Sequence, residues 1–147
     1  MRNNGALKGC KGHIGGDSFD NGNKALTDAQ TIGLAPIQLD QIESLIAAAG
    51  VDGTRAIMEA FQRSTVELLS SLSNGVEGGS LDDAYRTAHA VKGSAANVGA
   101  QLLSETAAAI ERACKAGDAA TAAERLADAQ SHFDMFCVHF EAHLAQY

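Results

Sequence analysis

The sequence predicts an all-α fold, built as an antiparallel up-down-up-down four-helix bundle with an additional short N-terminal helix. Apolar residues recur at steps of three and four over most of the chain after residue 38, a spacing that places them on one face of a helix. Alanine and leucine dominate the apolar set and aromatic residues make up only 5%, which favours helix-on-helix packing. Glycines separate the periodic stretches, and such short connections force consecutive helices to run antiparallel.

The chain of 147 residues divides into a tail, residues 1–36, and a predicted helical bundle, residues 37–147. The tail is rich in glycine and asparagine and has no sustained apolar period, so it cannot bury enough surface to order itself. We therefore expect a flexible leader. A tail that docks onto the bundle or onto a partner is the alternative. Pro36 marks the boundary.

Two helices are expected in the first half of the bundle. A short one spans about residues 40–49, ends at Gly50 and covers one end of the bundle. A second helix is capped by Asp52 or Thr54 and reaches about Leu72. Its inward residues are expected to be Ile57, Met58, Phe61, Leu68, Leu69 and Leu72.

The third helix is predicted to follow a break at Asn74-Gly75 and Gly78-Gly79. Ser80 with Asp83 three residues later matches a capping box, which marks the start of a helix. We expect this helix to end at Gly99, with His89 on a flank, neither buried nor fully free. Its core stripe is predicted to be Leu81, Ala84, Ala88, Val91, Ala95 and Val98.

Two further helices complete the predicted bundle. One begins near Gln101 and ends at Gly117, and the last is capped by Asp118. The inward residues of the first are expected to be Leu103, Ala107, Ile110 and Ala113. Those of the last are expected to be Ala119, Ala122, Leu126, Ala129, Phe133, Phe136 and Phe140.

Composition and charge exclude several functions. A formal charge of −7 with no stripe of Lys and Arg argues against binding to nucleic acid or to an anionic membrane. No apolar run approaches the roughly 18 residues of a spanning helix, and the amino terminus lacks the apolar core of a signal peptide. Cys10, Cys114 and Cys137 are widely spaced, so neither a disulfide framework nor a zinc site is indicated. We expect a cytoplasmic protein.

The segment AHAVKGS, residues 88–94, places a reactive ring, a cation and a gap on one helical face. Lys92 and Gly93 both border His89, because residues three and four apart are neighbours on a helix. A glycine inside a helix costs roughly 1 kcal/mol relative to alanine, so its presence needs a reason. A bare backbone beside the imidazole lets a large partner approach, and an ammonium group suits an oxyanion on the ring nitrogen. These features predict a phosphoryl-carrying histidine; the alternative is an unreactive, half-buried one.

The longer string AHAVKGSAANVGA, residues 88–100, resembles the active helix of histidine-containing phosphotransfer (HPt) domains. The likeness continues to residue 118 and, with the helical pattern on either side, covers roughly residues 38–145. The resemblance supports His89 as the phosphoacceptor and Lys92 as the charge that offsets the phosphoryl group. Glu111, on the next helix, would accept a hydrogen bond from Nδ1 and orient the imidazole with Nε2 outward. The predicted docking surface is part of the second helix together with Tyr85, Arg86, His89, Lys92, Gly93 and Ala96.

The resemblance implies a monomeric phosphorelay intermediate. His89 would accept a phosphoryl group from the receiver-domain aspartate of a hybrid histidine kinase and pass it to the aspartate of a response regulator. No P-loop or ATP lid is found, so the chain is expected to be a phosphocarrier and not a kinase. No cofactor is expected on this chain, and the receiver domain would supply Mg²⁺.

Two other functions stay open at this point. A non-catalytic helical interaction module would use the same fold to hold a partner. The dimerisation and phosphoacceptor module of a histidine kinase usually has an acidic residue after its histidine, whereas this chain has Ala90. No metal site is predicted, because His132, His139 and His143 have helical spacing but lack a further ligand that completes a set.

Overall fold

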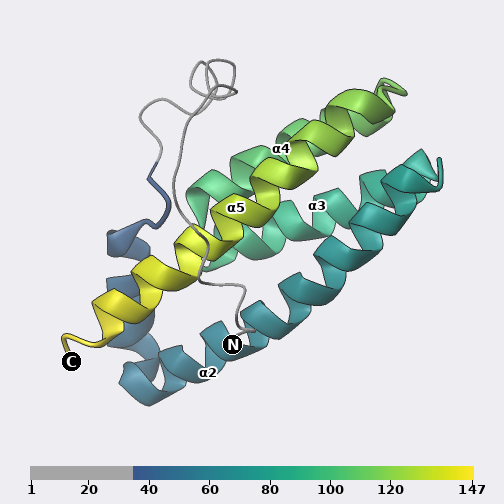
Figure 1. The fold of residues 1–147 in the computed structure, drawn as a ribbon. Helices are drawn as coiled ribbons and strands as arrows, with labels where there is room; N and C mark the ends of the chain where they lie inside the picture. Colours follow the sequence, from purple (N-terminus) through teal and green to yellow (C-terminus); the bar gives the residue numbers. More distant parts are fainter. Residues whose placement is uncertain (1–34) are drawn as a thin grey trace.

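The computed structural model describes residues 35–147, which form four helices packed as a bundle (Figure 1). The helices are α2 (Leu39–Glu77), α3 (Leu81–Asn97), α4 (Gln101–Lys115) and α5 (Ala119–Leu144). Each helix packs against the next along the chain, and α5 also packs against α2, which closes the bundle. The predicted all-α four-helix bundle is confirmed. Residues 1–34 of the predicted tail lie outside the described part of the chain.

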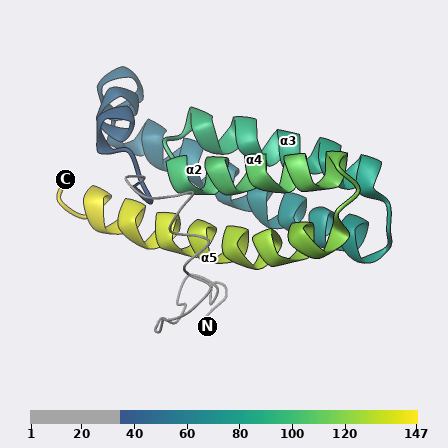
Figure 2. The same ribbon diagram turned by 90° about the horizontal axis from the view of Figure 1, so that it is seen from above.

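A turn at Gly50 divides α2 into two parts. Gly50 has φ 80° and ψ 172°, so the backbone leaves the helical region there. The part before Gly50 stands at a steep angle to the rest of α2, across one end of the bundle (Figure 2). The additional short helix predicted over residues 40–49 corresponds to this first part of α2, which continues into the rest of α2 at Gly50 without a connecting loop. Glycine reaches positive φ without the penalty that a Cβ imposes, which lets the helical path resume directly after the turn.

The break predicted at Asn74-Gly75, between the second and third helices, is too early in the sequence, because α2 continues through Gly75 to Glu77. Gly75 is buried, and a Cβ built on it would lie 3.3 Å from the Cβ of Ala84 on α3. The missing side chain lets the two helices approach closely at this point. The chain turns instead at Gly79, which has φ 79°.

The predicted helix caps differ in outcome. Ser80 precedes α3 but makes no side-chain capping bond, so the predicted capping box does not form. Asp83 accepts a hydrogen bond of 3.2 Å from Arg86 Nη1 instead. Asp118 caps α5 as predicted, since its Oδ1 accepts from the backbone N–H of Thr121 at 3.0 Å.

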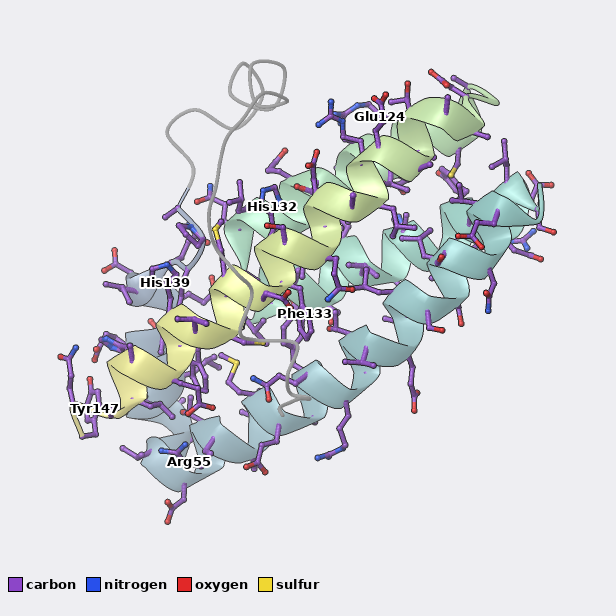
Figure 3. The ribbon with its side chains drawn as sticks, viewed as in Figure 1. Arg55, Glu124, His132, Phe133, His139 and Tyr147 are labelled. Atoms are coloured by element: carbon purple, nitrogen blue, oxygen red, sulfur yellow. The ribbon has the colours of Figure 1, made fainter. Side chains whose placement is uncertain are left out.

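The core forms where the inward faces of the four helices meet. Phe61 of α2 packs edge-to-face against Phe133 and Phe136 of α5, with ring centroids 6.1 and 5.5 Å apart. In Figure 3, Phe133 points from α5 toward the interior of the bundle. The predicted stripe of α3 is confirmed, with Leu81 half-buried and the other members buried: Ala84, Ala88, Val91, Ala95 and Val98.

Two predicted core residues are exposed. Ile57 is 38% exposed, because the inward period of α2 runs through Thr54 and Met58 and leaves Ile57 on the flank. Ala119 is the first residue of α5, at the tip of the bundle, where no neighbouring helix covers it. A pattern of apolar residues leaves out buried threonines such as Thr54. For this reason the predicted inward face of α2 wrongly includes Ile57.

The N-terminal part of α2 holds the end of α3 in place. The backbone N–H of Gln38 donates to the carbonyl of Gly99 at 2.8 Å. Nε2 of Gln41 donates to the carbonyl of Asn97 at 2.9 Å. These bonds satisfy carbonyl groups that the end of a helix leaves without partners. No helix among residues 35–147 is long and apolar enough to span a membrane.

Candidate functional site

Three side chains from two neighbouring helices meet at the middle of α3. Nδ1 of His89 lies 2.6 Å from Oε2 of Glu111, and Nζ of Lys92 donates to Oε1 of the same carboxylate at 2.7 Å. His89 and Lys92 are on α3 and Glu111 is on α4. The side chain of Glu111 is only 11% exposed, so these bonds form partly away from water, where they are stronger than on an open surface.

The ionisation of Glu111 decides which nitrogen of His89 carries a proton. Burial raises the pKa of Glu111, but the hydrogen bonds from Lys92 and then from His89 outweigh it and hold the pKa below its ordinary value. The ionised carboxylate can only accept hydrogen bonds, so Nδ1 of His89 must donate. A neutral imidazole with its proton on Nδ1 keeps a lone pair on Nε2, which makes Nε2 the nucleophilic nitrogen.

His89 lies on the solvent-exposed flank of α3. Its side chain is 64% exposed, and the neighbours toward the end of α3, Gly93 and Ala96, are small. Gly93 is exposed, and a Cβ built on it would have no atom within 4 Å. Ala96, one turn further on, is also exposed. The ring is therefore open to a large partner from the side of Gly93.

Lys92 has a second interaction that the sequence analysis missed. The hydroxyl of Ser104 on α4 donates to the backbone carbonyl of Lys92 at 3.0 Å. This carbonyl belongs to the peptide that joins Lys92 to Gly93, the weakest point of the helix by propensity. Ser104 lies seven residues before Glu111, two turns earlier on the same face of α4. This seven-residue spacing between Ser104 and Glu111 is the feature of the sequence that could have predicted that Ser104 also faces α3.

The residues of the predicted docking surface are placed differently from one another. Tyr85 is half-buried and packs against the core, so little of its ring is available. Arg86 is exposed and pairs with the equally exposed Asp83, a contact that contributes little in water. Together with the open face at Gly93 and Ala96, Arg86 borders His89 on the solvent side of α3.

The other histidines of the described chain are in separate environments. His132 is buried, and its Nδ1 lies 2.7 Å from the hydroxyl of Thr106. Nε2 of His143 lies 2.6 Å from Glu43, and His139 is exposed. Residues 35–147 contain no group of three or more His, Cys, Asp or Glu side chains that could hold a metal ion.

Comparison with known proteins finds a matching family model and a similar solved structure. The family model described as the Hpt domain matches residues 56–146, well over half of the chain. Among solved structures, the histidine-containing phosphotransfer protein B from Pseudomonas aeruginosa PAO1 is similar, with a TM-score of 0.72 and 22% sequence identity. The match covers 78% of this chain and 99% of that one, and at this identity it supports the fold alone. No curated protein matches the sequence.

Proposed function

The chain belongs to the Hpt domain family, and we propose that it acts as a phosphorelay intermediate with His89 as its phosphoacceptor. Hpt domains are phosphotransfer domains that interact with receiver domains, and they are phosphocarriers rather than kinases. The dimerisation module of a histidine kinase, considered from the sequence, is therefore set aside. The observation that carries the proposal is the bond of 2.6 Å between His89 and Glu111, beside a surface left open at Gly93.

The proposed reaction transfers a phosphoryl group from an aspartyl phosphate of a receiver domain to Nε2 of His89. The lone pair of Nε2 forms the N–P bond as the P–O bond to the aspartate breaks, and the aspartate leaves as a carboxylate. No proton is lost, because Nδ1 keeps its hydrogen. The ring becomes cationic, and the carboxylate of Glu111 at 2.6 Å stabilises the charge that develops.

Lys92 supplies positive charge beside the transferring group. One of its three N–H donors is used by Glu111, which leaves two for oxygens of the phosphoryl group. Phosphoryl transfer depends mainly on positioning and on charge stabilisation, so this small set of side chains is sufficient for a carrier. The receiver domain would supply Mg²⁺ with its own carboxylates.

The donor we propose is the receiver domain of a hybrid histidine kinase, and the acceptor is the receiver domain of a response regulator. The reverse reaction uses the same geometry, with the acceptor carboxylate attacking phosphorus and Nε2 leaving. The chain would act as a monomer, since the bundle is closed by α2 and α5 and needs no second copy to complete the site.

A transfer assay tests the proposal. Purified protein is mixed with a receiver domain carrying a radiolabelled phosphoryl group and Mg²⁺, and label on the protein is measured. The wild type and His139→Gln should take up label, while His89→Gln should take up none. His139 is an exposed helix histidine and serves as the matched control. Uptake by His89→Gln equal to that of the wild type would refute the assignment of His89. No uptake by any of the three proteins, the wild type included, would favour an interaction module without phosphate chemistry.

A further inference from the structure

Positive charge is concentrated around His89 in a domain that is otherwise acidic. Residues 35–147 contain seven Lys and Arg against fifteen Asp and Glu, a formal charge of −8. The segments 85–93 and 107–115, one turn on either side of His89 and Glu111, carry four cations and one anion. The rest of the described domain therefore carries −11, because these two segments carry +3.

Two of these four cations, Arg112 and Lys115, are on α4 and were not part of the predicted docking surface. Both are exposed, and neither forms an ion pair with any residue that the structure describes. Arg86 and Lys92, on α3, are paired with Asp83 and Glu111 respectively. Arg112 and Lys115 therefore keep their charge available to a partner.

Their positions on α4 place them beside the site. Ser104 and Glu111 define the face of α4 that contacts α3, since both bond to groups of α3. Lys115 lies one turn beyond Glu111 on this face, and Arg112 follows Glu111 on the neighbouring, solvent-facing side. Helices α3 and α4 run side by side over their length (Figure 2). Two cations of α4 thus lie within about one turn of Glu111, the residue through which α4 contacts His89.

We propose that Arg112 and Lys115 form a second side of the docking surface, on α4, and that they select a receiver domain whose surface around its phosphorylated aspartate is acidic. This inference rests on the proposed function of His89. An acidic receiver domain is attracted to the site and repelled by the remainder of the Hpt domain. The electrostatic field of the Hpt domain therefore orients the two proteins as they associate. Such steering acts over about 10 Å at 0.1 M salt and is lost as salt rises.

Variants that remove the charges of Arg112 and Lys115 without changing the fold test whether these residues belong to the docking surface. Arg112→Ala, Lys115→Ala and the double variant are compared with Arg63→Ala. This control removes an exposed, unpaired arginine that lies two residues from the buried Phe61 and Thr65, on the side of α2 that faces away from the bundle and its neighbouring helices. At about 0.05 M NaCl, each single α4 variant should lower the second-order rate constant of transfer about threefold, and the double variant about tenfold. At about 0.5 M NaCl the differences should vanish. The rate at saturating receiver should not change, because neither residue contacts the reacting atoms.

A binding measurement separates this inference from the proposed function. The four changes are repeated in His89→Gln, and the affinity for the same receiver domain is measured by titration calorimetry at both salt concentrations. The affinity at low salt should fall for the α4 variants and not for Arg63→Ala. Equal effects of Arg63→Ala and the α4 variants, or effects that persist at high salt, would overturn the surface while leaving phosphotransfer by the wild type intact. If no receiver phosphorylates or binds the protein, both proposals fail.

Discussion

Oε2 of Glu111 and Nδ1 of His89 lie 2.6 Å apart across the interface of α3 and α4, so a carboxylate on one helix fixes the proton of an imidazole on the other. The same carboxylate binds Lys92 through its second oxygen. The reactive ring is therefore exposed to solvent but oriented by a buried group. This combination suits the role proposed for His89, in which different receiver domains reach the ring without changing its geometry.

Removing the carboxylate should change the tautomer of His89. In Glu111→Ala we expect the population with the proton on Nε2 to rise, because Nδ1 loses its acceptor, and transfer to slow about tenfold or more. Nitrogen NMR shifts of the imidazole report the tautomer directly. Glu105→Ala, an exposed acidic residue on the same helix, is the control. An unchanged tautomer in Glu111→Ala would contradict the role assigned to the bond.

Gly93 should show opposite effects on stability and on transfer. Gly93→Ala should raise the free energy of unfolding by about 1 kcal/mol, because glycine is a poor helix former and no atom blocks the added Cβ. Urea unfolding measures this change. Gly93→Phe should fold but slow transfer about tenfold or more by covering the approach to His89. Ala90→Phe adds the same bulk to an exposed position of α3 and should transfer normally. Normal transfer by Gly93→Phe would refute the need for an open face.

Ser104 should contribute to stability through the backbone of Lys92. Ser104→Ala removes the donor to that carbonyl and should lower the free energy of unfolding by about 1 kcal/mol, whereas Ser104→Thr keeps a hydroxyl and should recover most of the loss. Ser44 donates within its own helix, to the carbonyl of Asp40, so Ser44→Ala should cost nothing comparable. Equal losses for the two alanine variants in urea unfolding would show that the bond between helices is unimportant.

Stability should fall on mild acidification because of His132. Burial lowers the pKa of His132; Asp128 opposes this effect and Arg125 adds to it. The unfolded chain therefore binds a proton at a higher pH than the folded one, so the free energy of unfolding decreases as pH falls below about 6.5. In His132→Gln the loss between about pH 7 and 5 should be smaller, and in the exposed His139→Gln it should match the wild type. An unchanged pH dependence in His132→Gln would place the titration elsewhere.

Much of the fold follows from the helical period of the sequence, because alanine and leucine at steps of three and four admit few other arrangements. The errors have specific causes. The pattern around Gly75 predicts the end of a helix, but in the structure Gly75 lies inside α2 and lets it pack closely against Ala84. The sequence alone does not distinguish a glycine that ends a helix from one that allows close packing. Thr54 and Thr65 are buried on the inward face of α2, which an apolar pattern leaves out.

The site was partly predictable for a related reason. His89, Lys92 and Gly93 are local on one helix, so their spacing alone places them together. Glu111 was reached through the antiparallel arrangement of two helices and the family resemblance. Ser104, Arg112 and Lys115 depend on which face of α4 meets α3, and that rotation is fixed only by the packing of the whole bundle.

Mass spectrometry that preserves phosphohistidine tests the central claim most directly. The protein is incubated with a phosphorylated receiver domain and Mg²⁺, kept at alkaline pH and fragmented to locate the added mass. We predict that the modification lies on His89 and is absent from the other histidines. A phosphoryl group found on His132, His139 or His143 would contradict the account. A protein that takes the phosphoryl group from the receiver domain but carries it on no histidine would contradict it as well.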